Sequence, residues 1–216
     1  MASDLEIFLE SDLYFKLLKD LKVKSELMNI SLTDKIAKKL ISFIFYVNKW
    51  NKTHNLTSIT DFNEMLTKHI LDSISVNSHV AKENYLDIGT GAGFPGVPLA
   101  ILNPDKKFYL LDGASKRINF IKYATAILDI KNVEAIHARM ENYKSSVKFD
   151  GIFSRAVSSF ENLIELSSHL VTQDRTKYYF LKANIDIKEL ESLKLNFFVE
   201  DILIPGLNAK RSLVII

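Results

Sequence analysis

Cysteine is absent from this chain of 216 residues, while glycine, proline and tryptophan are scarce, with seven, four and one copies. Without cysteine the chain can form no disulfide and no thiolate nucleophile or metal ligand, which favours a reducing cytoplasm. The apolar runs are far shorter than the ~20 residues that cross a bilayer, and the N-terminal residues lack the basic start and apolar core of a signal peptide. The five histidines have no metal-binding spacing, so we expect a cytoplasmic protein without membrane segments or bound metal.

Apolar residues make up 47% of the sequence, which is enough for a substantial core in one large domain or in one domain with an extension. The formal net charge of +2 is too small to indicate nucleic-acid binding by itself. The distribution of charge is more informative, because residues 105–148 hold nine Lys and Arg against five Asp and Glu.

Four of the seven glycines lie within residues 84–98. They are Gly89, Gly91, Gly93 and Gly96. A short apolar run, residues 85–88, precedes this cluster, and a helix-like run, residues 97–102, follows it. Glycine adopts φ > 0 and lets a ligand approach the backbone closely. A strand, a glycine turn and a helix with Pro98 in its first turn therefore predict a small-molecule site lined by backbone N–H groups.

The spacing of these glycines leaves two kinds of ligand open. Gly91, Gly93 and Gly96 match the G-x-G-x-x-G pattern of dinucleotide sites, whose turn holds a pyrophosphate. The overlapping G-x-G-x-G pattern begins at Gly89, and Asp87 stands two residues before it. A carboxylate there can order the loop and attract the ammonium of S-adenosylmethionine, while the helix N-terminus favours the carboxylate of the same ligand. The tighter pattern favours S-adenosylmethionine.

Asp112 is the second acidic candidate, because it ends the strand-like run 107–112, nineteen residues after Gly93. An acidic residue about 20 residues after the glycines is placed to accept hydrogen bonds from the ribose hydroxyls of either ligand. The alternative is that Asp112 caps the helical run that starts near Lys116. We assign Asp112 to the ribose.

Residues 1–80 contain no glycine and no proline and are predicted to form three helices. In the second helix Ser31 is the expected cap, and apolar residues then recur at helical spacing. Residues 51–57 are polar and are expected to form a loop, and the third helix begins near Asp61. We interpret 1–80 as a helical extension and 81–216 as the ligand-binding domain.

From residue 84 onward, strand-like and helical segments alternate, which is typical of a doubly wound α/β fold with a mostly parallel sheet. The predicted strands are 85–89, 107–112, 133–137, 149–154, 177–182, 198–204 and 212–216. The predicted helices are 97–103, 116–129, 158–170 and 187–194. Pro205-Gly206 lies between the last two strands, which favours a closing hairpin and an antiparallel last strand.

Ligands of such sheets bind outside the carboxyl ends of the strands. The first four predicted strands end at Gly89, at Asp112, at Ala138–Glu141 and at Arg155. Met140 is expected to pack on an adenine face, and the backbone near Glu141 to read the edge of that base. The alternative is that these two residues belong to the core and to a solvated turn. Arg155 is expected to face ligand or RNA rather than to be a plain surface charge.

Six sequence blocks occur in an order that resembles the RsmG family, also called glucose-inhibited division protein B. The blocks are WNKTHNLT at 50–57, HILDS at 69–73, DIGTGAGFPGVPL at 87–99, LD and KR at 111–112 and 116–117, R-x-E at 139–141, and SRA at 154–156. The resemblance covers nearly the whole chain. It implies a class I methyltransferase with a Rossmann-like, seven-stranded sheet that uses S-adenosylmethionine to methylate N7 of one guanine in bacterial 16S rRNA.

The resemblance also implies cofactor contacts, to which the loop pattern adds three residues. The resemblance gives Gly89, Phe94, Met140, Glu141 and Arg155, with Asp112 on the ribose. The loop pattern adds Asp87, Gly91 and Gly93. The chain departs from the family at Gly113, where serine is common, and at Ala183, where glycine is common. These two departures change a position near the ribose and a position near the expected target pocket.

Guanine N7 has an in-plane lone pair and no proton to lose, so its methylation needs no general base, metal or covalent intermediate. The absence of cysteine agrees with this chemistry, because it disfavours the cysteine-based route to carbon methylation. Catalysis would then be mostly positioning, which can supply ~7–11 kcal/mol, and Arg155 is the candidate positioning residue. The reacting base must leave its stack to enter a pocket.

Candidate contacts to 16S rRNA are basic and polar side chains from both parts of the chain. They are Lys116, Arg117, Lys122, Arg155, Lys182, Lys210 and Arg211, with Lys52, His54, Asn55 and His69 on the helical side. Each lysine alone is equally explained as a solvated surface charge, and His69 and Asp72 could simply bond each other or hold the helical layer to the sheet. We expect a monomer.

Two other functions stay open. One is a methyltransferase of the same fold that acts on tRNA, protein or a small molecule. The other is an NAD-dependent oxidoreductase, for which the sequence has no recognisable hydride-transfer constellation.

Overall fold

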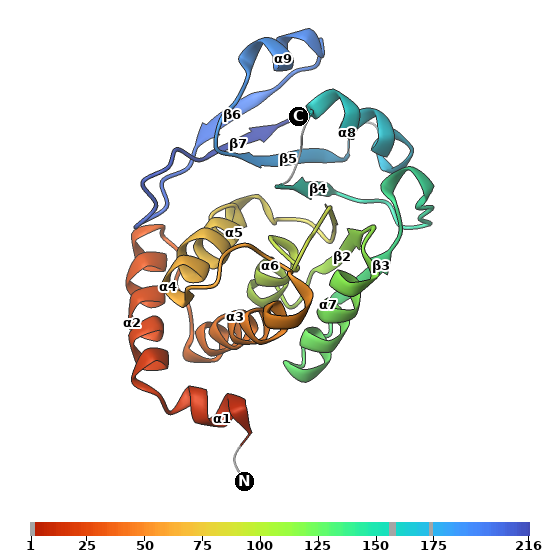
Figure 1. Ribbon diagram of the computed structural model, residues 1–216. Coiled ribbons are helices and arrows are strands. Elements are labelled where there is room, and N and C mark those ends of the chain that lie inside the picture. The colour runs from red at the N-terminus through yellow and green to blue at the C-terminus, as the bar shows by residue number, and fades with distance from the viewer. Residues whose placement is uncertain (1–2, 156–158, 173–174) are drawn as a thin grey trace.

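The computed structural model describes residues 3–155, 159–172 and 175–216. These residues form a seven-stranded sheet in the order β3-β2-β1-β4-β5-β7-β6 (Figure 1). The strands are β1 Asn84–Ile88, β2 Lys107–Asp112, β3 Val133–His137, β4 Gly151–Ser154, β5 Lys177–Lys182, β6 Phe198–Asp201 and β7 Ser212–Ile215. Strands β1 to β5 pair in parallel, whereas β7 runs antiparallel to β5 and β6. The predicted doubly wound sheet with an antiparallel last strand is confirmed.

Helices precede the sheet and connect its strands. They are α1 Asp4–Leu9, α2 Asp12–Leu27, α3 Asp34–His54, α4 Phe62–Met65, α5 Asp72–Ile74, α6 Gly96–Leu102, α7 Ser115–Ile127, α8 Phe160–Ser167 and α9 Ile187–Ser192. A π-helical segment, Leu66–Leu71, joins α4 to α5. The side chain of Asp61 accepts the N–H of Glu64, so the third predicted helix begins where the sequence indicated.

The N-terminal helices differ from the prediction at three points. The segment before α3 forms two helices, α1 and α2, because the Ser11 side chain caps a new helix there. Thr33, not Ser31, caps α3, because the Thr33 hydroxyl accepts a backbone N–H of the first turn. Helix α3 also continues to His54, so most of the loop expected at 51–57 is helical. Trp50 and His54 pack against each other one turn apart, with ring centroids separated by 4.9 Å, and such a pair stabilises the helix.

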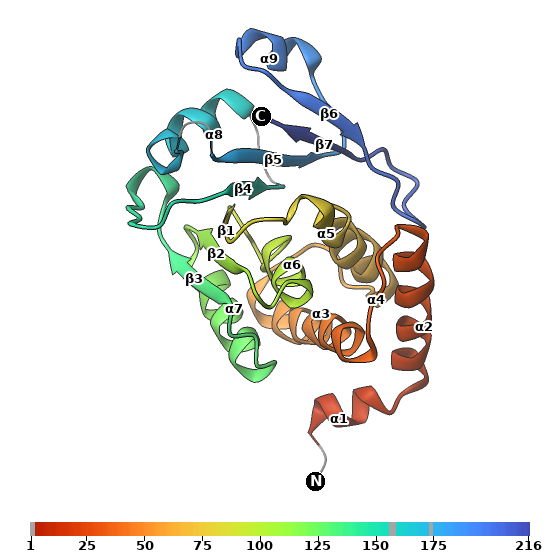
Figure 2. The same cartoon turned by 180° about the vertical axis from the view of Figure 1, so that it is seen from behind.

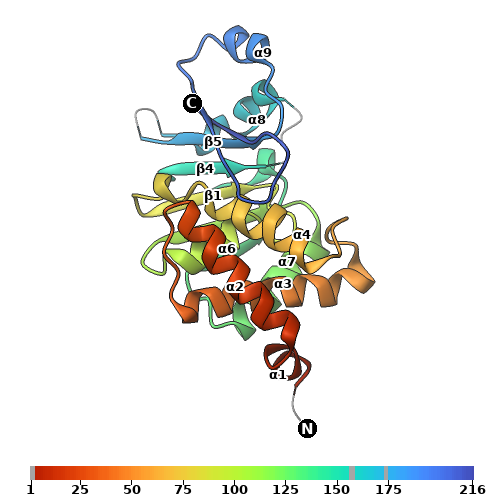
Figure 3. The same cartoon turned by 90° about the vertical axis from the view of Figure 1, so that its left-hand side faces the viewer.

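The sheet separates two hydrophobic cores. Along β1, Tyr85 belongs to the core formed with α2, α3, α6 and α7, whereas Leu86 belongs to the core formed with α8 and α9. This alternation follows from the pleat of a strand, and Figures 1 and 2 show the two groups of helices on opposite sides of the sheet. Leu17 and Leu21 of α2 are fully buried in the same core as Tyr85, and Figure 3 shows α2 passing across α3. The N-terminal helices therefore share one core with the sheet.

The connection between β6 and β7 reaches back to the end of α2 (Figures 1 and 2). A Cβ atom added at Gly206 in this connection would lie 3.0 Å from the Lys24 Nζ atom of α2. This route brings Arg211, just before β7, to the N-terminal helices. Among the described residues, no helix has both the length and the apolar character needed to pass through a bilayer.

Candidate active site

The residues that follow β1, β2 and β3 converge on one cavity of about 410 Å³ at the carboxyl edge of the sheet, here called the first cavity. Its lining residues are Ile88, Gly89, Leu111, Asp112, Gly113, Ala114, Arg117, Ala138, Arg139, Met140 and Glu141. Four of the predicted cofactor contacts are thus brought together, although they are spread over more than fifty positions of the sequence. Parallel strands that end at one edge produce this convergence.

The glycines of the β1–α6 loop have two different roles. Gly89, Gly91 and Gly93 have φ values of +69°, +60° and +95°, which other residues rarely adopt. A Cβ at Gly89 or Gly91 would meet nothing within 4 Å, so these positions leave backbone open to a ligand. A Cβ at Gly93 would lie 2.7 Å from Val97 Cγ2, so this glycine is required for packing of the loop on α6.

Asp87 orders this loop from beneath. Its Oδ2 atom accepts the Thr90 hydroxyl at 2.6 Å and the Gly96 N–H at 2.9 Å, which ties both ends of the loop to the end of β1. Its Oδ1 atom is buried without a hydrogen-bond partner among the described residues. Burial raises the pKa of Asp87 from 3.8 to about 6, although the two hydrogen bonds oppose this shift. The predicted role in ordering the loop is confirmed.

Asp112 links the first cavity to the next helix. Its two oxygens accept the Gly91 N–H at 3.0 Å and the Ala114 N–H at 2.8 Å, and Arg117 Nη1 lies 3.2 Å away. The carboxylate therefore fastens the loop after β1 to the turn before α7, as the helix-cap alternative predicted in part. Arg117, expected among the RNA contacts, lies in the first cavity instead.

A short 3₁₀ helix, Met140–Asn142, contributes Met140 and Glu141 to the wall of this cavity. Met140 is half-buried against the core of α8 and α9, while Glu141 is exposed. Ile88 and Leu111 supply further apolar surface to the cavity. Asp112 and the apolar side chains of this cavity fit a ribose and an adenine.

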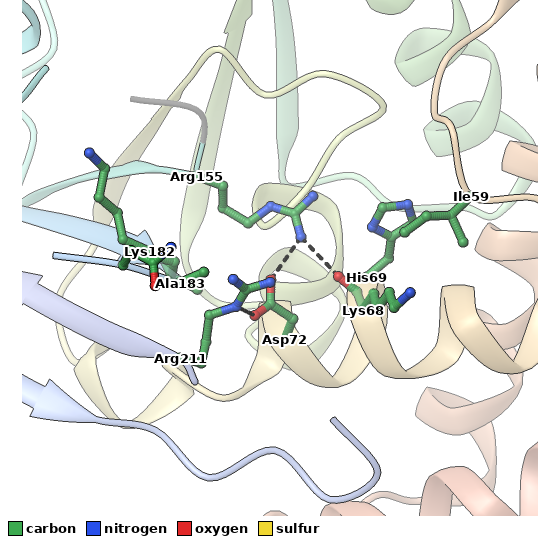
Figure 4. A pocket seen from close by; sticks show the side chains of 10 residues that line it. Ile59, Lys68, His69, Asp72, Arg155, Lys182, Ala183 and Arg211 are labelled. Atoms are coloured by element: carbon green, nitrogen blue, oxygen red, sulfur yellow. Dashed lines mark hydrogen bonds and ion pairs between the residues drawn. The ribbon is translucent and has the colours of Figure 1, made fainter. Parts of the chain in front are cut away.

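A second cavity, of about 570 Å³, lies beyond the ends of β4 and β5 (Figure 4). Its lining residues are Ile59, Lys68, His69, Asp72, Arg155, Leu181, Lys182, Ala183, Asn184 and Arg211. Asp72, whose side chain is only 2% exposed, accepts hydrogen bonds from Arg155 Nη1 at 3.0 Å and from Arg211 Nε at 2.6 Å. One buried carboxylate of α5 thus holds two guanidinium groups that come from the ends of β4 and of the β6–β7 connection.

His69 lies beside these charges. Its Nε2 atom is 2.9 Å from the Thr57 hydroxyl, its Nδ1 atom has no partner among the described residues, and its ring stacks on Phe94 at 4.5 Å. Burial, and next the charge of Arg155, lower the pKa of His69 to about 3, so the imidazole is neutral at physiological pH. His69 and Asp72 do not bond each other, because each has a different partner.

Not all predicted cofactor and RNA residues meet in these cavities. Arg155 lines the second cavity, and Phe94 is buried beneath it, with the Arg155 guanidinium 5.3 Å from the Phe94 ring centroid. Lys182 also lines the second cavity, with its Nζ atom 4.3 Å from the Phe160 ring centroid. Lys210 is exposed and pairs with Asp201. The other expected RNA contacts, Lys52, His54, Asn55, Lys116 and Lys122, lie on α3, just after it, and on α7.

Sequence reasoning left open that Asp72 holds the helical layer to the sheet, but it missed the partners of Asp72 and the contact of Thr57 with His69. Both residues stand in blocks that were singled out, so the blocks marked the region. The partners of Asp72 are 83 and 139 positions away, however, and no local pattern indicates them.

The family model described as GidB, rRNA small subunit methyltransferase G, matches residues 36–214. A protein named Ribosomal RNA small subunit methyltransferase G from Histophilus somni (strain 129Pt) is 45% identical over 181 residues, covering 82% of this chain and 85% of its own length. Its namesake from Shewanella woodyi is 42% identical over 190 residues, covering 87% and 92%. The chain belongs to this family. The methyltransferase assignment that the sequence blocks implied is thereby confirmed.

Solved structures agree on the fold of this methyltransferase G family member. A SAM dependent methyltransferase from Aquifex aeolicus aligns with a TM-score of 0.55 at 18% identity, covering 77% of this chain and 96% of that one. M. capricolum TrmK, solved with S-adenosyl-homocysteine, aligns with a TM-score of 0.52 at 14% identity, covering 66% of each. At such identities the likeness shows the class I methyltransferase fold alone, which is the fold predicted.

The first cavity fits the cofactor of the rRNA small subunit methyltransferase G family, S-adenosylmethionine. Asp112 is an acceptor beside open loop backbone, whereas Asp87 does not line this cavity and lies buried beneath the loop. The two departures from the family pattern fall one in each cavity. Gly113 lies in the first, where an added Cβ would meet only Arg139 Cγ, at 3.8 Å, and Ala183 lies in the second.

Proposed function

We propose that this protein transfers the methyl group of S-adenosylmethionine to N7 of a guanine in bacterial 16S rRNA, in the cytoplasm and as a monomer. The observation that carries the proposal is the placement of the two cavities on either side of the end of β1, which pairs with β2 on one side and β4 on the other. One cavity suits an adenosine and the other presents two guanidinium groups. The names of the relatives support rRNA as the substrate.

In the first cavity, the protein holds the cofactor through backbone, an apolar side chain and two carboxylates. Asp112 accepts the ribose hydroxyls, Met140 packs on the adenine, and the backbone of Gly89 and Gly91 borders the methionine part. Asp87 faces the ammonium from beneath the loop. S-adenosylmethionine supplies an electrophilic methyl group, and the protein fixes where that group can be reached.

In the second cavity, the side chains orient the guanine. Arg155 and Arg211 are pure donors, so they bind acceptors such as guanine O6 or a phosphate oxygen. The neutral ring of His69 has a free Nδ1 position for one further polar contact. Because guanine N7 carries no proton, none of these groups has to act as a base. They hold the N7 lone pair in line with the methyl group, and such positioning can lower the activation barrier by ~7–11 kcal/mol.

Methyl-labelled cofactor tests this proposal directly. The protein is incubated with small ribosomal subunits, and separately with their naked RNA, from cells that lack the modification, and the digested nucleosides are identified by mass spectrometry. We expect labelled 7-methylguanosine at one position, and no label in subunits that already carry the methyl group. Binding of the cofactor without any labelled guanosine would contradict the proposed target and favour a tRNA, protein or small-molecule substrate.

A further inference from the structure

Helices α3 and α7 pack side by side and present a row of aromatic rings. Trp50 contacts Tyr123 with ring centroids 5.1 Å apart, and His54 follows Trp50 at 4.9 Å. Near the start of α3, Lys39 donates to the backbone oxygen of Asp129 just after α7, so the two helices run in opposite directions. The row therefore lies at the end of α3 and over the first two-thirds of α7.

The rings of this row pack on other aromatic side chains on their inner side and are partly exposed on their outer side. Phe120 is fully buried and lies 5.6 Å from Trp50, while Tyr46 packs edge-on against Tyr123 at 5.7 Å. Tyr123 is 37% exposed, and Trp50 and His54 are half-buried. An isolated exposed aromatic would be unremarkable, but three fixed and partly open rings form a surface on which flat groups can stack.

The charged residues of these two helices are almost all basic. Together α3 and α7 carry seven lysines and one arginine against a single acidic residue, Asp34, which pairs with Lys22 of α2. Lys49 is neutralised by Asp4, and Arg117 by Asp112. Three lysines that flank the rings are exposed and make no ion pair within the described residues. They are Lys52, Lys116 and Lys122.

The aromatic row starts at the edge of the sheet where both cavities open. The segment after α3 carries Thr57, which bonds His69, and Ile59, which lines the second cavity. Helix α7 begins directly after the first cavity, which Arg117 also lines. A chain that leaves the second cavity can therefore run onto the row without crossing the sheet.

We propose that Trp50, His54 and Tyr123 stack on unpaired bases of the RNA strand that flanks the target guanine, while the lysines beside them neutralise its phosphates. Stacking on aromatic rings beside a basic groove is a sequence-tolerant way to bind single strands. A duplex offers its phosphates but not its base faces, so the rings would discriminate against it. This inference rests on the proposed function, because it assigns the path of the same substrate.

Trp50 is the only tryptophan of the chain, so its fluorescence reports directly on this surface. The wild-type protein is titrated with single-stranded oligoadenylate and with the same strand paired to oligouridylate. We expect quenching by the single strand and weak binding of the duplex. Tyr123→Ala should weaken single-strand binding about fivefold or more, since one stacking contact is lost, while Tyr123→Phe should retain it.

The charge contribution is tested by Lys122→Glu against a matched control. Lys188→Glu makes the same change on α9, at the opposite end of the sheet (Figure 1). We expect Lys122→Glu, but not Lys188→Glu, to weaken RNA binding and to raise KM for the ribosomal substrate, with kcat and cofactor affinity unchanged. Equal cofactor affinity and equal thermal unfolding in all variants show that the fold is intact.

The outcomes separate this inference from the proposed function. Wild-type RNA affinity and KM in both Tyr123→Ala and Lys122→Glu, or tighter binding of the duplex than of the single strand, would overturn the stacking surface even where 7-methylguanosine forms. Quenching that these substitutions abolish, in a protein that forms no 7-methylguanosine, would support the surface and refute the proposed target.

Discussion

The two cavities lie on one edge of one sheet, but they are built from different parts of the chain. The first is lined by three segments within residues 88–141, which follow three neighbouring strands, and its Asp112 carboxylate binds loop backbone. The second draws on four separate places, residues 59–72, Arg155, residues 181–184 and Arg211, and presents charged side chains. Under the proposed function, the cofactor lies beside loop backbone and Asp112, whereas the RNA meets guanidinium groups that tertiary structure has to bring together.

The two cavities also differ in the interactions that fix their geometry. In the first, positive φ values and hydrogen bonds within the chain segment set the loop, so its geometry is largely local. In the second, both guanidinium groups depend on Asp72, so its geometry depends on one buried charge. Substitutions can therefore test whether the cavities fail separately.

The largest effect is expected for Asp72→Asn, which would break the second cavity alone. The substitution leaves two partly buried guanidinium groups without their anion and should lower the free energy of unfolding by about 3–5 kcal/mol. Displaced guanidinium groups should also reduce methyl transfer by about 100-fold or more. Denaturant unfolding and single-turnover assays measure the two effects.

Cofactor affinity is the readout that decides whether Asp72→Asn acts on one cavity. If the folded Asp72→Asn variant loses affinity for S-adenosylmethionine by as large a factor as it loses methyl-transfer rate, the two cavities are not independent. Asp105→Asn is the matched control, because Asp105 forms an exposed ion pair with Lys106 outside both cavities. It should behave like wild type in every assay.

Asp112→Ala should break the first cavity while leaving the second intact. The N–H groups of Gly91 and Ala114 and the Arg117 guanidinium lose their acceptor, so the loop loosens and the ribose loses its partner. We expect the Kd for S-adenosylmethionine to rise about tenfold or more, as measured by calorimetry, since hydrogen bonds to a charged group are lost. Unchanged affinity would refute the ribose assignment.

The pH dependence of stability should differ in sign between the two cavities. The pKa of Asp87 is raised to about 6, so protonated Asp87 stabilises the folded state below about pH 4. This stabilisation, about 3 kcal/mol, is lost as the pH rises through 6. The pKa of His69 is lowered to about 3, so its contribution is present above pH 6.5 and is lost as the pH falls.

Urea unfolding from about pH 4 to about pH 7 measures both contributions as differences from wild type. Asp87→Asn should become relatively more stable toward neutral pH, and His69→Gln relatively more stable toward acid. Two difference curves with the same slope would contradict the burial that disfavours the charged form of both residues.

The smallest effect is expected for Gly113→Ser, which restores the common family residue in the first cavity. An added Cβ would have only Arg139 Cγ within reach, at 3.8 Å, so stability should stay within about 0.5 kcal/mol of wild type. A hydroxyl beside the ribose should improve cofactor affinity by about threefold. A loss of affinity would show that the cofactor lies differently in this cavity.

The sequence was sufficient to predict the features that depend on local patterns. Glycine spacing identified the loop at Gly89–Gly93, and alternation of strands and helices yielded the sheet and placed Asp112, Met140 and Glu141 at one edge. Boundaries were less certain, because a cap depends on which of two nearby hydroxyls reaches the first turn. Thr33 does so and Ser31 does not.

The second cavity could not be assembled in this way. Arg155 and Arg211 were both singled out, but nothing near either residue in the sequence indicates that Asp72 holds them. A pairing of residues 83 and 139 positions apart is set by the order of the strands and by the path of the β6–β7 connection. Charge partners at such separations become visible only when the fold is known.

Because Arg155 and Arg211 share Asp72, evolutionary substitutions at these three positions depend on one another. While one guanidinium remains, the buried carboxylate keeps a counter-ion, so either Arg155 or Arg211 can be replaced first at moderate cost in stability. Replacement of the second then leaves a buried, uncompensated anion, and the loss exceeds the sum of the single losses. Lineages that lose both arginines should therefore have replaced Asp72 as well, so these three positions are expected to vary together rather than one by one.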